Sequence, residues 1–436
     1  MTQPIDHARR RARLAERIGD RAVAMLAATP ERIRNRDVHY PYRADSDMRY
    51  LTGFTEPEAV AVLVPGRPDG EFILFCRDRD PEREVWDGRR AGPEGACRDF
   101  GADQAFPIQE LAQRLPELLA DRDTIHHSLG ADDWADRQLT AALDRIRAMG
   151  RRGWQTPTQI GLLPAVLHDM RLRKEPAELD RMRHAAAVSA AAHCRAMRVC
   201  RPGMAEYALA AELHHEFEAA GMHWAYPSIV GGGANACILH YIENSATLAD
   251  GDLVLIDAGA ENAGYAADIT RTFPVSGRFS GPQRDLYAVV LAAQEAAVDA
   301  VRAGNDYDAF NRAAVRELCR GMLDLGLLSG DLETVIEQQD YKRFYMHGTG
   351  HWLGMDVHDV GDYKVEGKWR LLEPDMVVTV EPGLYVPAGS EGVDERFWNT
   401  GIRIEDDVRV TDGAPEVLTA GVPKRADEIE ALMADG

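Results

Sequence analysis

Apolar and polar residues alternate with two different periods along the first third of the chain. Residues 22–28 form a short apolar run, and two further runs flank a Pro- and Gly-rich turn at residues 65–70. Short apolar runs on either side of such a turn are typical of a β-hairpin, whereas apolar positions every three to four residues indicate amphipathic helices. The pattern predicts strands at residues 22–28, 59–64, 71–76 and 124–127, and helices at residues 108–119, 132–149 and 166–172.

The character of the chain changes at Lys174-Glu175-Pro176. Proline suits the first turn of a helix, and the Ala-rich residues after it predict one long helix over residues 177–199. We place the domain boundary here, with an N-terminal domain over residues 1–173 and a C-terminal domain over residues 174–436. The second domain is predicted to hold helices at residues 205–220, 282–303 and 307–325, Gly-punctuated strands from residue 226, and a second block of strands at residues 346–410.

Two apolar strands of the second domain each end in a carboxylate. One apolar run ends at Asp257 and another at Glu381. A second predicted strand follows each of them and also carries an acid, Asp268 in the first case and Glu405 in the second. This repeat suggests a pseudo-symmetric sheet with one site between its halves.

Asp257 and Asp268 are predicted to face each other. A hairpin that turns near residues 261–264 would make their strands neighbours, and side chains opposite each other on such strands lie close together. Two carboxylates at that distance repel unless a cation lies between them, and an ionised carboxylate on a buried strand is costly without a partner. The sequence also allows Asp257 to be a turn residue and Asp268 to form a salt bridge with Arg271.

Glu405 belongs to a strand with an alternating pattern. Period-two alternation puts Arg403 and Glu405 on the face opposite two isoleucines. Such a face is commonly solvated, so only the company of the other acids favours a role for Glu405 in a site.

Residues 346–359 hold three histidines, His347, His351 and His358, and three glycines. The first two histidines are four residues apart, as in a zinc-protease helix, but the intervening glycines disfavour a helix. We expect a Gly-rich loop that leads into a strand and presents imidazoles to a cleft. His240, which follows a run of three glycines, is an equally good candidate for a structural histidine and for a site residue.

Charge and cysteine content narrow the function classes. The 436 residues carry a formal net charge of −21, which argues against sequence-independent binding of nucleic acid and against an anionic membrane surface. The N-terminus lacks the apolar core of a secretory signal, and no apolar run is long enough to span a membrane. Six scattered cysteines are too few for a disulfide scaffold in so long a chain. We therefore expect a cytoplasmic protein.

Four acids and one imidazole form an oxygen-rich donor set. Such a set favours Mn²⁺, Co²⁺ or Fe²⁺ over a structural zinc ion, which prefers thiolate and imidazole ligands. So many acidic ligands also suggest two metal ions that share bridging carboxylates.

The whole set of motifs resembles the pita-bread metallopeptidases, and within them the bacterial Xaa-Pro aminopeptidases (aminopeptidase P). The resemblance rests on the spacing of the four acids and His351 and on further motifs at residues 40–43, 51–54, 238–241, 347–358, 380–383 and 401–406. It implies an α+β protein, in which a creatinase-like α/β N-terminal domain precedes a pita-bread catalytic domain. It also implies a homotetramer or homodimer that binds two divalent metal ions, commonly Mn²⁺ (Zn²⁺ is a further possibility), and removes the N-terminal residue of peptides with proline second.

The resemblance also assigns roles to individual residues. Asp257 would bind one metal and His351 the other, Asp268 and Glu405 would bridge them, and Glu381 would bind beside the attacking hydroxide and move its proton. His358 would donate to the oxyanion or the departing nitrogen, His240 and His347 would line the proline subsite, and Arg403 would steady the carboxylates. The remaining candidates for substrate binding are Tyr385, Asp37, Trp86 and Arg152, of which the last three would lie near the active-site entrance.

Several alternatives remain at this point. A prolidase would share the fold, the metals and the preference for proline, but would cleave only dipeptides. A methionine aminopeptidase is disfavoured by the extra N-terminal domain, and a creatinase by the complete ligand set. A non-catalytic pita-bread protein that binds peptides is disfavoured because all five ligand positions are filled.

Overall fold

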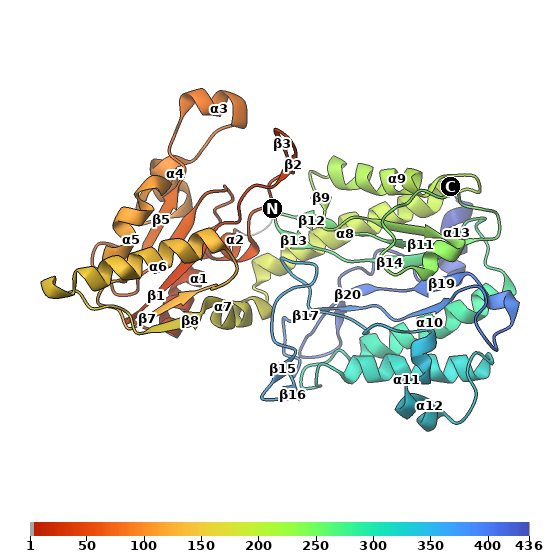
Figure 1. Ribbon diagram of the computed structural model, residues 1–436. Helices are drawn as coiled ribbons and strands as arrows, with labels where there is room; N and C mark the ends of the chain where they lie inside the picture. Colours follow the sequence, from red (N-terminus) through yellow and green to blue (C-terminus); the bar gives the residue numbers. More distant parts are fainter. Residues whose placement is uncertain (1–3, 436) are drawn as a thin grey trace. The chain divides into compact units, whose positions relative to one another are not determined.

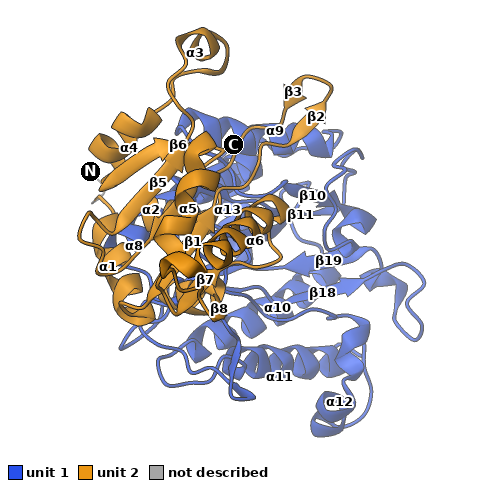
Figure 2. Ribbon diagram, turned by 60° about the vertical axis from the view of Figure 1, so that its left-hand side comes forward, with its two compact units in different colours: residues 1–3, 171–436 blue, residues 4–170 orange. Residues whose placement is uncertain are grey.

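The computed structural model describes residues 4–435 (Figure 1). These residues form two compact units, one over residues 4–170 and one over residues 171–435 (Figure 2). The division between Met170 and Arg171 lies three residues before the boundary at residues 173/174, which remains a prediction. Among the described helices, none has both the length and the apolar character that crossing a membrane requires.

The N-terminal unit is built on a six-stranded mixed sheet. Its strand order is β6 (Gln104–Pro107), β5 (Phe72–Cys76), β4 (Val60–Leu63), β1 (Ala22–Ala27), β7 (Thr124–His127) and β8 (Gln159–Leu162). The predicted hairpin is confirmed, because β4 and β5 pair antiparallel with Val60 opposite Phe75. The predicted helices are also confirmed as α5 (Leu111–Leu119), α6 (Asp133–Ala148) and α7 (Leu163–Leu172). Leu115 of α5 and Ile146 of α6 belong to the same buried apolar cluster as Val23 and Val62 of the sheet.

The other elements of this unit are short except for the first helix. They are α1 (His7–Ile18), β2 (Ile33–Asn35), β3 (Val38–His39), α2 (Ser46–Thr52), α3 (Pro81–Asp87), α4 (Gly92–Phe100), η1 (Ile108–Glu110) and η2 (Gly150–Arg152).

The C-terminal unit begins with long helices, as the sequence predicted. Helix α8 (Pro176–Val199) starts at the expected proline, and Glu175 and Glu178 form a capping box at its N-terminus. The other helices are α9 (Glu206–Ala219), α10 (Gly281–Ala300), α11 (Ala309–Asp324), α12 (Leu332–Gln338) and α13 (Ala426–Ala434), with 3₁₀ turns η3 (Gly233–Cys237), η4 (Asp340–Arg343) and η5 (Glu395–Phe397).

Two small sheets carry the predicted repeat. In one sheet β11 (Leu253–Asp257) lies between β10 (Ile229–Gly232) and β14 (Thr270–Pro274), and in the other β20 (Asp406–Arg409) lies between β17 (Val377–Val380) and β21 (Glu416–Val417). Both central pairings are antiparallel. The remaining strands are β9 (His223–Trp224), β12 (Ala260–Asn262), β13 (Tyr265–Ala266), β15 (Lys364–Val365), β16 (Lys368–Trp369), β18 (Gly383–Val386) and β19 (Thr400–Arg403).

Each of these sheets is backed by two helices. Apolar residues of β11 share a buried cluster with those of α8 and α9, such as Met197 and Leu213. Val378 and Val380 of β17 share another cluster with Phe310 of α11 and with residues of α10. The burial of both strands explains their continuous apolar runs.

Two details of the sequence prediction are wrong. The Gly-rich loop after Met346 does not lead into a strand, because the next described strand is β15 and only an isolated bridge joins Trp352 to Val378. The strand predicted to contain Asp268 is interrupted at residues 267–269, between β13 and β14. Asp257 therefore lies opposite Thr270 rather than opposite Asp268.

Candidate metal and substrate site

The C-terminal unit contains a cavity of about 560 Å³ lined by most of the predicted site residues. All five predicted metal ligands line it, although they come from positions up to 148 residues apart in the sequence. The cavity is lined by the following predicted residues: His240, Asp257, Asp268, His347, His351, His358, Glu381, Arg403 and Glu405.

The first sheet supplies two carboxylates that share one hydroxyl group. The Tyr226 hydroxyl donates to Asp257 Oδ1 at 2.6 Å and also contacts Asp268 Oδ1. Asp268 does not pair with Arg271, so that alternative from the sequence is wrong. The Asp268 backbone N–H instead donates to Asp407 Oδ2 at 3.1 Å, which ties the first sheet to the second.

Arg403 is the cation that faces these acids. It is 3% exposed, and its Nη2 donates to Asp257 Oδ2 at 2.5 Å. Its Nε donates to Thr270 Oγ1, whose hydroxyl in turn donates to Glu405 Oε2 at 2.6 Å. One guanidinium thus orients two of the four acids, one directly and one through a threonine.

His351 presents one ring nitrogen to the acids. Its Nδ1 lies 3.0 Å from the Trp352 carbonyl oxygen, so Nδ1 is the protonated nitrogen. Its Nε2 then faces Asp268 Oδ2 at 3.5 Å and Glu381 Oε1 at 3.8 Å. A backbone partner on one nitrogen and an open second nitrogen are typical of a metal-binding histidine.

The other site histidines surround this centre. The His358 ring lies 4.2 Å from the ring of His351, measured between centroids. His347 Nε2 lies 2.9 Å from the Tyr385 hydroxyl, which accepts from Arg403 Nη1 at 3.1 Å. Tyr385 is 1% exposed and is absent from the cavity lining, so its contact with His347 is its link to the site.

Burial makes this group of acids electrostatically unfavourable. Burial and the neighbouring carboxylates raise the pKa of Glu405 well above its usual range, and burial raises the pKa of Glu381 to about 7. Burial lowers the pKa of His351, but its contact with Asp268 and the charge of Glu381 outweigh burial and raise that pKa to about 9. One arginine and one histidine cannot balance four acids of which three are buried.

The residues present fit a divalent metal ion. Ligand atoms of Asp268, His351 and Glu405 all lie within 4.8 Å of one another. Carboxylate oxygens with one imidazole are a donor set that divalent ions such as Mn²⁺ accept. A cation would also relieve the repulsion that raises the carboxyl pKa values.

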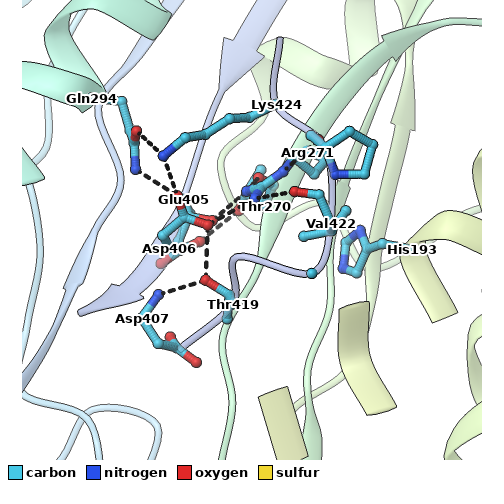
Figure 3. Close-up of polar contacts among 12 residues, drawn as sticks. His193, Thr270, Arg271, Gln294, Glu405, Asp406, Asp407, Thr419, Val422 and Lys424 are labelled. Atoms are coloured by element: carbon cyan, nitrogen blue, oxygen red, sulfur yellow. Dashed lines mark hydrogen bonds and ion pairs between the residues drawn. The ribbon is translucent and has the colours of Figure 1, made fainter. Parts of the chain in front are cut away.

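A second network lies behind the ligands and was missed by sequence reasoning (Figure 3). Arg271 is fully buried and donates from Nη1 to the Glu405 carbonyl at 2.5 Å and from Nη2 to Asp406 Oδ1 at 2.7 Å. Asp406 also accepts from Lys424 Nζ at 2.8 Å. This network fixes the backbone of the segment that carries Glu405.

Tyr226 and Thr270 were also missed as site residues. Each contacts predicted ligands through a hydroxyl group, Tyr226 at Asp257 and Asp268 and Thr270 at Glu405. Nothing in the local sequence marks either residue, because Tyr226 lies in a bend before β10 and Thr270 is an ordinary residue of β14; only their contacts with the acids identify them.

The other three predicted site residues belong to the N-terminal unit. Asp37 lies in the turn between β2 and β3, Trp86 lies on α3 and is 84% exposed, and Arg152 ends η2. Their roles at an active-site entrance remain predictions.

Comparison with known proteins gives consistent matches along the chain. Residues 180–412 match the model of "Metallopeptidase family M24", and residues 7–126 match that of "Aminopeptidase P, N-terminal domain". The Xaa-Pro aminopeptidase of Escherichia coli K12 is 46% identical over 428 residues, which cover 98% of this chain and 96% of that protein.

Solved structures agree with this match. The structure of the Pseudomonas aeruginosa aminopeptidase PepP has a TM-score of 0.98 at 52% identity, with 100% of this chain and 99% of that chain covered. The E. coli aminopeptidase P with the inhibitor Pro-Leu has a TM-score of 0.96 at 44% identity, with 99% of each chain covered.

Proposed function

The chain belongs to metallopeptidase family M24 and to its Xaa-Pro aminopeptidases, and we propose that it hydrolyses the N-terminal Xaa-Pro bond of peptides. The observation that carries the proposal is the convergence of four acids and His351 on one cavity with three further histidines. The pita-bread fold and the creatinase-like N-terminal domain predicted from the sequence are confirmed by the similarity to aminopeptidase P structures.

We propose two divalent metal ions, with Mn²⁺ as the most suitable. Asp257 would hold one and His351 the other, Asp268 and Glu405 would be shared, and Glu381 would complete the set. When bound, such ions lower the pKa of water towards neutrality and polarise a carbonyl group.

The residues of this chain then supply proton transfer and orientation. The Glu381 carboxylate takes a proton from the attacking water and delivers it to the prolyl nitrogen, acting first as general base and then as general acid. His358 donates a hydrogen bond to the oxygen that becomes negative in the transition state. Asp257 receives the free α-amine of the substrate.

The proline subsite is formed by His240 and His347. Burial and the positive charge of Arg403 lower the pKa of His347 to about 4, so its ring is neutral and offers an uncharged surface to the proline ring. Tyr385 holds His347 through its hydroxyl group, and Arg403 holds both Tyr385 and Asp257.

Three finer statements belong to the same proposal. The protein acts in the cytoplasm, as its sparse unpaired cysteines suggest. It forms a homotetramer or homodimer, and Asp37, Trp86 and Arg152 bind substrate near the entrance to the cavity. The exposed apolar ring of Trp86 supports this, because such a ring is available for a ligand or a second copy of the chain.

A cleavage assay tests the function. The protein is stripped with a chelator, reloaded with Mn²⁺, and given an Xaa-Pro dipeptide and an Xaa-Pro-Yaa tripeptide. Release of Xaa from the tripeptide at least as fast as from the dipeptide supports the aminopeptidase. Cleavage of the dipeptide alone would instead identify a prolidase, and inactivity of the metal-loaded protein on both would refute the proposal.

Glu381→Gln tests the mechanism in the same assay. The variant should lose about 10²–10⁴-fold in kcat because it lacks the proton-transferring group. Metal content is measured alongside, because near-wild-type turnover with both ions bound would contradict the role of Glu381.

A further inference from the structure

We propose that the protein binds the substrate residues after proline in a second cavity beside His240, and that Glu243 there selects against a free carboxylate on the proline. This inference rests on the proposed function and deepens it, because it names a residue that determines specificity, Glu243, and adds a preference for a cationic third residue of the substrate.

The second cavity adjoins the first. It has a volume of about 430 Å³ and is lined by residues of one segment between Asn235 and Ala246. His240 and Ile242 line both cavities, so the two share a wall of side chains. A peptide chain whose proline lies against His240 can therefore continue along this segment.

The segment is built as a rigid loop, which we call the His240 loop (residues 233–246). Fully buried Glu206, at the start of α9, accepts from the backbone N–H of Gly232 and of Ala246, both at 2.8 Å, one just before the loop and one at its end. The same carboxylate accepts from Asn235 Nδ2 at 3.0 Å and from the Tyr241 hydroxyl at 2.8 Å. Four donors on one carboxylate preform the cavity before substrate binds.

The surface of the loop suits a peptide. Ile238 and Ile242 are 53% and 58% exposed, so they offer apolar contact beside the backbone groups. Isolated exposed apolar residues are common, but these two line a cavity that adjoins the candidate active site.

Charge then separates long peptides from dipeptides. Glu243 lines the second cavity, and of the described residues that line either cavity only Arg403 carries a permanent positive charge. Arg403 is already bound to Asp257. A dipeptide would bring its prolyl carboxylate towards Glu243 without a free cationic side chain to receive it, whereas a longer peptide presents a neutral amide there.

The test uses the Mn²⁺-loaded full-length protein with four substrates: Ala-Pro, Ala-Pro-amide, Ala-Pro-Lys-amide and Ala-Pro-Glu-amide. An exposed charge pair changes an equilibrium by up to about fivefold. We expect kcat/KM to favour Ala-Pro-amide over Ala-Pro, and Lys over Glu at the third position, each by about fivefold at low salt. Both ratios should shrink at high ionic strength.

Glu243→Gln should bring both ratios near one, and Glu243→Lys should invert them. The matched control is Glu337→Lys, an exposed acid on α12 that lines neither cavity and should leave both ratios unchanged.

Unchanged kcat/KM ratios in Glu243→Lys would overturn the inference. The same holds if this variant changes only the oligomeric state of the protein, because a second copy of the chain would then cover the His240 loop. Cleavage of all four substrates at equal rates by the wild-type protein would also overturn it while leaving the aminopeptidase intact. Failure to cleave any of them would instead refute the proposed function.

Discussion

The buried carboxylate of Asp406 offers a quantitative test of how the site is held. It accepts four hydrogen bonds, from Arg271 Nη2 at 2.7 Å, Thr419 Oγ1 at 2.8 Å, Lys424 Nζ at 2.8 Å and Gln294 Nε2 at 2.9 Å (Figure 3). Burial raises the pKa of Asp406, but the charges of Arg271 and Lys424 and their hydrogen bonds together outweigh burial and lower that pKa to about 2. The carboxylate is therefore ionised in the folded protein at neutral pH.

Asp406→Asn removes the charge and turns one acceptor into a donor. If the new amide nitrogen takes the place of Oδ2, it faces the donors of Lys424 and Gln294, and two bonds are lost at about 1–3 kcal/mol each. Lys424 is partly exposed and can turn to water, but Arg271 is fully buried and keeps an uncompensated charge. Removing one partner of a buried ion pair costs about 3–5 kcal/mol.

Thermal unfolding in the presence of a chelator measures this cost, because metal binding then adds no stability. For a domain of this size about 4 kcal/mol corresponds to a fall in Tm of about 8–16 °C in the transition of the C-terminal unit. The matched control is Glu317→Gln, the same chemical change in the exposed pair with Arg320, which should cost less than about 1 kcal/mol. If Asp406→Asn unfolded within about 2 °C of the wild type, the network would not stabilise the site.

Three further substitutions test other parts of the site. Gly350→Ala should abolish metal binding, measured by metal analysis after dialysis, because a Cβ there would lie 1.9 Å from the Thr379 carbonyl oxygen. The control Gly348→Ala has open space around the new Cβ and should retain the metal. Equal loss of metal in both variants would contradict this reasoning. Burial lowers the pKa of His193 to about 4, so the wild type should lose roughly 3 kcal/mol of its free energy of unfolding as pH falls from about 6.5 to 4. His193→Gln should show a flatter dependence of this free energy on pH in urea unfolding. Parallel pH profiles of the two proteins would refute the lowered pKa of His193. Asp359→Asn removes the carboxylate that Arg171 and Lys174 share beside His358, although Asp356 still pairs with Arg171, and we expect at least a tenfold loss of kcat together with a Tm several degrees lower. Wild-type kcat would show that this ion cluster does not position the loop.

Strand and helix positions were largely predictable because periodicity is a local property of the sequence. The long helix after Pro176 and the hairpin around residues 65–70 are where turn residues and apolar spacing placed them. The candidate ligands were also found locally, because acids at the ends of apolar strands need a partner. The predicted pairing of Asp257 with Asp268 was wrong. The chain leaves the strand at residues 267–269, so Asp257 lies opposite Thr270 instead.

The sequence by itself determined the residue types of the site and the two strand pairs that carry them, because a buried acid at the end of an apolar run is visible without any fold. Only the tertiary structure decided the partners. Arg271 turned to Asp406 rather than Asp268, and Tyr226 and Thr270 reached the acids from positions with no distinguishing pattern. These contacts join residues more than 30 positions apart, and the geometry of such contacts depends on packing that local periodicity does not encode.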